Sequence, residues 1–229
     1  TEALQSAPTL SIVTDIEHLF SSNSGIYANP GGRGVAWERP ASVELIDTNG
    51  VGQFQVNCGI RIHGGGKRKI SNRKHSMRLL FKSEYGPTKL NYPLYGDAAN
   101  DSFNTLVLRC GLDEVVSVYV GVADEWTRRS HVAMERPAPY GYFFHVYING
   151  MYWGVYNAHE RPDARFGAEY YGGSTDDYFA VKASDGIGMA HGGTHPEYLY
   201  VDGGLAAEAA YQNLLDEAAD NMSILAQYQ

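Results

Sequence analysis

The stretch YFFHVYINGMYWGVYN, residues 142–157, determines the fold of this chain more clearly than any other. Two runs rich in aromatic and β-branched residues, 142–148 and 151–157, are typical of β-strands. Asn149-Gly150 separates them, and this dipeptide favours a two-residue hairpin turn because both residues tolerate positive φ. The stretch therefore predicts an antiparallel hairpin joined at 149–150.

Upstream of this hairpin, further runs show the two-residue alternation of half-buried strands. A second hairpin is predicted between 42–47 and 54–63, because Asn49-Gly50 lies between them and alternate residues from Phe54 to Ile62 are apolar. Strands are also expected at 75–82 and 105–110, and shorter ones at 9–13 and 178–182.

Helical patterns occupy other parts of the chain. One turn is expected at 15–20, and a longer amphipathic helix is expected from about 115 to 134, before Pro137 and Pro139. Two more are expected at 164–171 and 205–227, and residues 185–204 are expected to form a loop. These elements fit one domain, or one lobe with the start of a second.

Charge is unevenly distributed along the 229 residues. The net charge of −8 argues against a protein that coats nucleic acid, yet residues 61–89 contain half of the 18 Lys and Arg and a single acid, Glu84. This asymmetry indicates an anion site of a kind that suits phosphate, and a solvated basic hairpin tip is the equally good alternative. No run of 18 apolar residues exists, so we expect no membrane span.

The cysteines and histidines give weaker signals. Cys58 and Cys110 each lie in a strand-like run, where free buried thiols are the favoured interpretation over a disulfide. His191, His195 and Asp185 could hold a metal, but the glycines and proline around them argue against the helix that this spacing needs. The adjacent pair His159-Glu160 is considered structural rather than a general base, because neighbours on a strand point to opposite faces.

A glycine-rich segment, Gly64-Gly65-Gly66, follows the predicted strand 54–63. Such a turn lets backbone amides approach phosphates, and Lys74 on the next strand could neutralise phosphate charge. Asp124 or Glu125 on the long helix could then pair with Lys74. An ordinary turn, a solvated strand-end lysine and a helix-capping acid are the alternatives for the same residues.

Several motifs together resemble the CotH family of spore-coat-like kinases over about residues 8–185. The most specific is the Asn-Gly block at 146–157, which matches the family pattern Y-x-N-G-x-Y-x-G-x-Y. The other similar segments are GIRIHGG at 59–65, KHSMRLLF at 74–81, LVLR at 106–109, DEWTR at 124–128 and ERPD at 160–163.

The resemblance implies an α+β, atypical protein-kinase-like fold: an antiparallel N-lobe sheet with a helix and a hinge, followed by a truncated C-lobe. It implies binding of ATP with Mg²⁺, phosphorylation of serine in a protein substrate, and a secreted or cell-surface bacterial protein. It also implies which residues bind the nucleotide: Arg61, Gly64, Gly65, Lys74, Arg78, Asp124, Tyr156, Glu160 and Arg161.

Under this resemblance the domains are an N-terminal extension at 1–40, the N-lobe at 41–160 and the start of a helical C-lobe at 161–229. The family's catalytic and metal-binding aspartate motifs do not occur in these residues, so no catalytic or metal-ligating residue is assigned. We expect the chain without its missing C-lobe not to transfer phosphate. The alternative is a non-catalytic surface or spore-coat module that binds through its aromatic hairpin.

Overall fold

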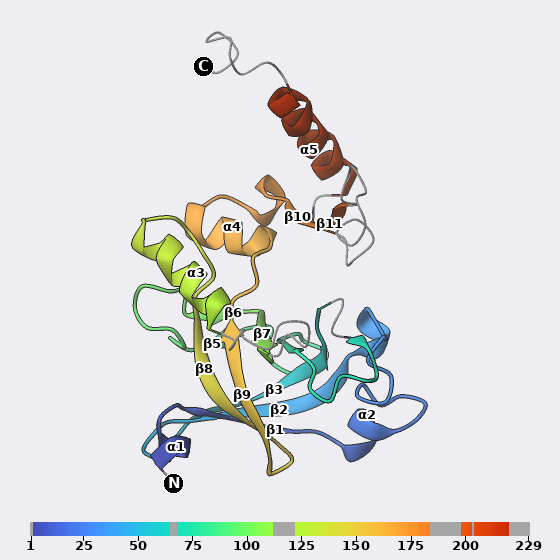
Figure 1. Cartoon of the computed structure of the whole chain (residues 1–229), viewed down its shortest axis with the longest axis vertical. Coiled ribbons are helices and arrows are strands. Elements are labelled where there is room, and N and C mark those ends of the chain that lie inside the picture. Colours follow the sequence, from blue (N-terminus) through green and yellow to red (C-terminus); the bar gives the residue numbers. More distant parts are fainter. Residues whose placement is uncertain (1, 65–67, 112–121, 184–197, 203, 220–229) are drawn as a thin grey trace. The chain divides into compact units, whose positions relative to one another are not determined.

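The computed structural model describes residues 2–64, 68–111, 122–183, 198–202 and 204–219 (Figure 1). The chain forms two compact units, Thr1–Arg161 and Pro162–Gln229. The first unit contains every residue proposed for the nucleotide site, so its architecture carries the functional argument.

A closed barrel of seven strands forms the first unit. In order around the barrel these are β1 (Thr9–Val13), β2 (Arg39–Ile46), β3 (Gly52–Ile62), β4 (Met77–Leu80), β7 (Thr105–Arg109), β9 (Met151–His159) and β8 (Gly141–Ile148). Neighbouring strands are antiparallel except β1 and β8, which pair in parallel from Thr9↔His145 to Ile12↔Ile148. Strand β1 therefore closes the sheet.

The expected fold class, an atypical kinase-like α+β fold with an antiparallel N-lobe sheet, a helix and a hinge, is wrong. A mixed closed barrel dominates the described structure, because β1 pairs with both β2 and β8 and leaves the sheet no free edge. Alternation of side chains indicates that residues 9–13 form a strand, but it does not indicate which distant strand they join.

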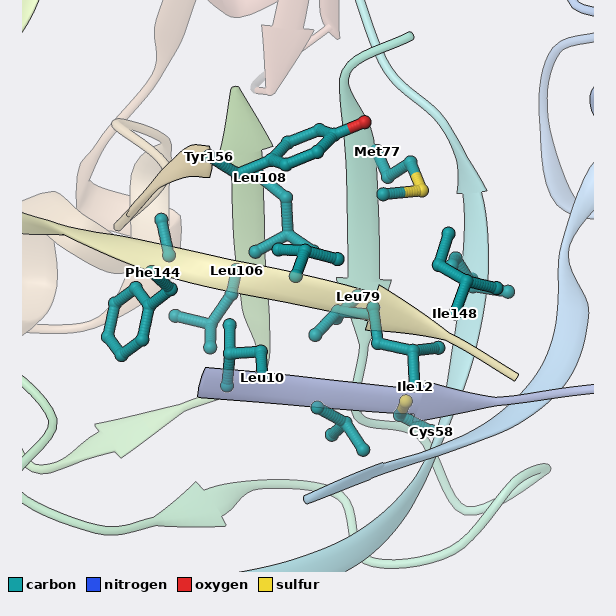
Figure 2. Close-up of a cluster of buried hydrophobic side chains, with 14 of the residues drawn as sticks. Leu10, Ile12, Cys58, Met77, Leu79, Leu106, Leu108, Phe144, Ile148 and Tyr156 are labelled. Atoms are coloured by element: carbon teal, nitrogen blue, oxygen red, sulfur yellow. The ribbon is translucent and has the colours of Figure 1, made fainter. Parts of the chain in front are cut away.

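The barrel interior is filled by alternate residues of all seven strands (Figure 2). The residues on the inner face are less than 2 % exposed at several positions, including Ile12, Ile60, Met77, Leu79 and Leu108. Full burial of such a side chain contributes about 1.5–3 kcal/mol, so this interior is the main source of stability. The predicted inner face of β3, from Phe54 to Ile62, is confirmed. Cys58 and Cys110 are buried free thiols, as predicted.

The hairpin at 142–157 is also confirmed. Strands β8 and β9 are joined by Asn149 and Gly150, whose φ angles are 49° and 79°. Two consecutive positive φ angles match the twist of the flanking strands. The Asn149 side chain also accepts a hydrogen bond from the backbone N–H of Thr14 at 3.0 Å, which attaches the hairpin to the chain just after β1.

Shorter elements surround the barrel in the first unit. They are α1 (Glu2–Gln5), α2 (Ile16–Phe20), the 3₁₀ turn Val35–Trp37, β5 (Leu90–Asn91), β6 (Ser102–Phe103) and α3 (Ala123–Ala133). The Asp15 side chain caps α2 by accepting from the N–H of Glu17 at 2.9 Å. The described part of the long helix expected at 115–134 is α3, and residues 115–121 lie outside the described residues.

The second unit contains α4 (Ala164–Tyr171), a 3₁₀ turn (Thr175–Asp177), β10 (Ala180–Ala183), β11 (Tyr198–Asp202) and α5 (Gly204–Ala219). Helix α4 has the predicted bounds, with Asp163 as its N-cap and Gly172 after its end. Strand β11 lies within the range 185–204, for which a loop was expected. The strand is defined by its pairing with β10, which is not adjacent in sequence, so a local pattern did not indicate it. Among the described helices, none is both long and apolar enough to cross a membrane.

Candidate functional site

A polar surface lies on the outside of the barrel, on strands β3, β4, β7 and β9. Since alternate residues of these strands fill the interior, those between them point outward. We name this surface the outer polar face and define it by five residues: Arg61, Arg78, Arg109, Asn157 and His159. In the strand register Arg61 lies opposite Arg78, and Arg109 lies opposite Asn157. The face therefore collects residues from four adjacent strands.

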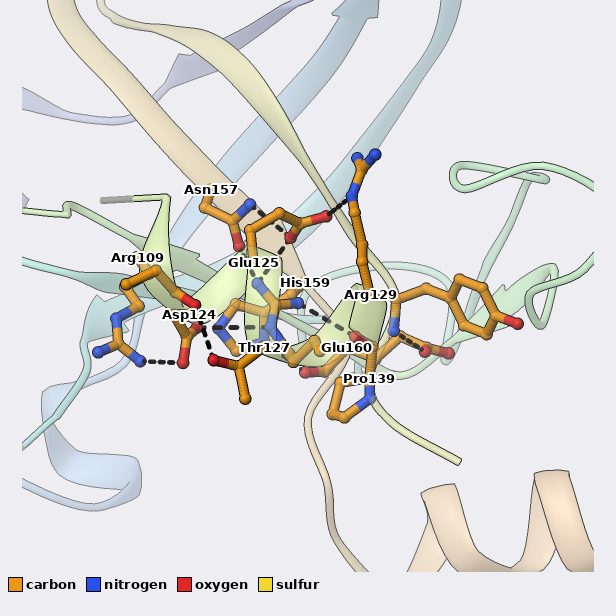
Figure 3. Close-up of polar contacts among 12 residues, drawn as sticks. Arg109, Asp124, Glu125, Thr127, Arg129, Pro139, Asn157, His159 and Glu160 are labelled. Atoms are coloured by element: carbon orange, nitrogen blue, oxygen red, sulfur yellow. Dashed lines mark hydrogen bonds and ion pairs between the residues drawn. The ribbon is translucent and has the colours of Figure 1, made fainter. Parts of the chain in front are cut away.

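Helix α3 is attached to this face through Glu125 (Figure 3). The buried Glu125 carboxylate accepts hydrogen bonds from Asn157 Nδ2 at 2.9 Å, Arg128 Nη2 at 2.8 Å and Arg129 Nε at 2.6 Å. Arg128 also donates to Asn157 Oδ1 at 2.5 Å, so the acid, the arginine and the amide form a closed network. Charge-assisted hydrogen bonds of this kind are roughly twice as strong as neutral ones.

Asp124, at the first turn of α3, joins the helix to the neighbouring strand. Its carboxylate lies 3.2 Å from Arg109 Nη1 and 3.4 Å from Arg128 Nε. The expected pairing of Asp124 or Glu125 with Lys74 is replaced by these arginine contacts. Asp124 therefore holds Arg109 at the edge of the outer polar face.

Close approach of α3 requires a glycine on β8. A Cβ placed on Gly141 would lie 2.5 Å from Arg128 Nη1, 2.8 Å from His159 Cβ and 2.9 Å from Glu125 Oε2. Contacts this short do not occur without movement of one partner. Gly141 thus determines how near the helix lies to the sheet.

His159 is held as a neutral ring on this face. Its Nδ1 donates to the backbone oxygen of Glu160 at 2.6 Å. Burial, and next the positive charge of Arg128, lower the His159 pKa to about 4. The Glu160 carboxylate accepts from the N–H of Tyr140 at 2.8 Å, so each side chain of the pair has its own backbone partner. A histidine with this pKa is a poor base at neutral pH.

Cations gather at the other end of the outer polar face. The Arg61 guanidinium lies 3.3 Å from the carboxylate of Glu38, a buried acid on the segment before β2. Burial lowers the Arg61 pKa, and the charge of Arg161 lowers it further, while Glu38 opposes both effects. Glu38 is shared, because Lys82 Nζ lies 2.6 Å from its other oxygen. Arg78 donates from Nε to Thr105 Oγ1 at 3.0 Å.

Lys74 and Tyr156 are in contact with each other. Tyr156 points into the barrel interior, and its hydroxyl donates to the backbone oxygen of His75 at 3.1 Å. Lys74 Nζ is 4.2 Å from the centre of the Tyr156 ring and donates to the backbone oxygen of Val155 at 2.8 Å. Burial lowers the Lys74 pKa. Through these contacts Lys74 has structural partners of its own.

The glycine-rich segment is only partly described. Gly64 has a positive φ of 95°, and its backbone oxygen accepts from Arg68 Nε. The Arg68 guanidinium also reaches the backbone oxygens of Ile62, Pro30 and Gly32, which ties this segment to the loop before β2. Gly65 lies outside the described residues, as do Asp185, His191 and His195.

The candidate residues thus divide into groups. Arg61 and Arg78 face each other, Asp124 belongs to the α3 side of the same face, and Glu160 and Arg161 follow β9. Lys74 and Tyr156 form a separate contact. Sequence reasoning did not select Glu38 or Asn157, whose partners lie 23 or more residues away along the chain. In the described part of the chain, no group of three His, Cys, Asp or Glu side chains could hold a metal ion.

These features define a class of protein first: a closed β-barrel domain that carries a helix-covered, arginine-rich polar face. The family model described as CotH kinase protein matches residues 60–221, which is more than half of the chain. The chain belongs to the CotH kinase protein family, as the motifs predicted. Membership indicates a kinase-like function. No curated protein matches the chain.

Proposed function

We propose that this chain is the nucleotide-binding part of a CotH-type serine kinase, and that it binds the phosphates of ATP on the outer polar face. Family membership supports the reaction class. The position of the arginines supports the choice of surface. In this proposal Arg61, Arg78 and Arg161 contact phosphate, and Asp124 positions Arg109.

The observation that carries the proposal is the like charge at Arg61 and Arg78. The two residues are direct partners on neighbouring strands, an arrangement that is unfavourable for two cations. Arg161 adds a third positive charge that acts on Arg61. The nearby acid Glu38 is shared between Arg61 and Lys82. An anion with several negative oxygens would relieve this repulsion, and phosphate accepts the paired hydrogen bonds that guanidinium groups offer.

Magnesium is part of the proposed reaction, but the described residues offer it no fitting site. Asp124 already pairs with two arginines, and no second or third ligand joins it among the described side chains. Mg²⁺ would ordinarily be held by one or two carboxylates together with the phosphates of the substrate. No step of the proposal therefore depends on a metal ligand from these residues.

Calorimetric titration with ATP and Mg²⁺ tests the proposal. Arg61→Gln and Arg78→Gln should each weaken binding about tenfold or more, because a hydrogen bond to a charged group contributes about 1.5–3 kcal/mol. The exposed Arg136→Gln provides a control with the same loss of charge. Equal affinity in all four proteins would contradict phosphate binding at this face, and adenosine should bind more weakly than ATP.

A second candidate function is supported by the exposed side chains of the β8–β9 hairpin. Met151 is 66 % exposed, Tyr152 49 % and Val155 42 %, which leaves apolar and aromatic surface open to solvent. A non-catalytic surface module could bind a partner there. Loss of partner binding in Tyr152→Ser, together with no nucleotide binding by the unaltered chain, would favour this candidate.

A further inference from the structure

A pocket lies at one end of the barrel, between helix α3 and the strand ends. Its volume is about 710 Å³, within the range of small-molecule sites. One wall is the α3 surface formed by Arg129, Val132 and Ala133. The other walls are the β2–β3 hairpin end, the segment 92–95 and residues 139–142 that lead into β8. All of these belong to the first unit.

The walls of this pocket are largely apolar. Leu45 and Phe144 form its floor from the inner face of the barrel, and Leu94, Pro139 and Val132 contribute aliphatic surface around them. Such a lining favours a ligand whose body is a hydrocarbon, because each buried methylene contributes about 0.8 kcal/mol.

The acids at the pocket have their own partners. Asp47 accepts from the N–H groups of Asn49 and Val51 and from the Gln53 side chain, so it stabilises the β2–β3 turn. Glu125 uses both oxygens on Arg128, Arg129 and Asn157. Neither carboxylate is placed to receive a cationic ligand.

Arg129 differs from these acids because only one of its side-chain nitrogen atoms has a partner in the described part of the chain. Its side chain is 60 % exposed and its Nε donates to Glu125. Within the described residues, its two Nη groups take part in no hydrogen bond or ion pair. They form a charged edge of a cavity whose lining is mostly apolar and whose acids are already paired, which is an arrangement that can recognise an anionic group on a hydrocarbon.

We propose that this pocket binds an amphipathic carboxylate of the size of a medium-chain fatty acid, with the carboxylate on Arg129 and the chain against Leu45, Val132 and Phe144. The pocket adjoins the α3 side of the outer polar face, because Glu125 and Arg128 line the pocket and also bond to Asn157. The proposed ligand contacts Arg129 instead, so the proposal does not depend on nucleotide binding. Its ligand is distinguished by two properties that can be varied one at a time, the charge of the head group and the volume of the tail.

Titration of the full 229-residue chain with decanoate tests this proposal, with decylammonium as the probe of opposite charge. Decanoate should bind at submillimolar concentration and decylammonium at least tenfold more weakly, since only the carboxylate pairs with the guanidinium. Arg129→Gln should lower decanoate affinity about tenfold, and Ala133→Trp, which places a bulky ring at the cavity wall, should also lower it.

Two controls match these variants. Arg136→Gln removes the same charge from an exposed position after α3, and His131→Trp introduces the same residue, tryptophan, at an exposed helix position outside the pocket. Both should bind decanoate like the unaltered chain, and circular dichroism checks that every variant is folded. The proposal is overturned if decanoate does not bind at millimolar concentration, if decylammonium binds equally well, or if Arg129→Gln and Ala133→Trp retain full affinity.

Discussion

Replacement of Glu125 by alanine should release α3 from the barrel. The Glu125 side chain is 6 % exposed, and its partner Arg128 is 11 % exposed, so the substitution leaves a nearly buried guanidinium without its main counter-charge. Removal of one partner from a buried pair costs about 3–5 kcal/mol. The contact with Arg129 adds little, because that side chain is 60 % exposed and solvent screens the pair. We expect the free energy of unfolding to fall by about 3–5 kcal/mol.

Urea unfolding followed by tryptophan fluorescence measures this change. All three tryptophans, Trp37, Trp126 and Trp153, lie in the first unit, so the signal reports on the barrel and α3 alone. Glu84→Ala, at an exposed position, should change stability by less than about 0.5 kcal/mol. A loss below about 1 kcal/mol in Glu125→Ala would refute the view that this network holds α3 in place.

Three further predictions concern single residues. His159 has a pKa of about 4 in the folded chain against an ordinary value of 6.5, so the unfolded chain takes up the proton first as pH falls. Protonation of His159 should therefore lower the free energy of unfolding by about 3 kcal/mol between pH 6.5 and 4. His159→Gln should remove that part of the pH dependence in urea unfolding. Gly141→Ala should destabilise the barrel by about 1–3 kcal/mol because its Cβ meets Arg128, whereas Gly31→Ala, in open space, should not; equal effects in thermal unfolding would contradict the close approach of α3. Lys74→Ala should lower stability by about 1–3 kcal/mol through loss of the Tyr156 ring contact and the backbone hydrogen bond, and unchanged stability with lost nucleotide binding would instead make Lys74 a ligand residue.

Local pattern predicted the strands and their inner faces well. The alternation in β3 and the Asn-Gly turn between β8 and β9 are properties of neighbouring residues, so they can be identified from a few positions. The bounds of α4 were also predicted, and in the structure Asp163 caps the helix and Gly172 follows its end. Closure of the barrel was missed because it depends on β1 meeting β8, more than 130 residues later.

The candidate site was predicted in part. Motifs selected Arg61, Arg78 and Asp124, which the fold brings to one surface, although their role in binding remains a proposal. The buried acid Glu38 could not be anticipated, since its cations come from β3 and from the segment after β4. Asn157 likewise acquires its importance only when α3 brings Glu125 within 2.9 Å. Such residues are defined by tertiary contacts rather than by any local spacing.

The most direct test of the central claim is a calorimetric titration of the double variant Arg61→Gln/Arg78→Gln with ATP and Mg²⁺, beside the unaltered chain. If the outer polar face binds the phosphates, the unaltered chain should bind ATP and the double variant should lose about a hundredfold in affinity while its unfolding curve still shows a folded barrel. A folded double variant that binds ATP as tightly as the unaltered chain would contradict the claim.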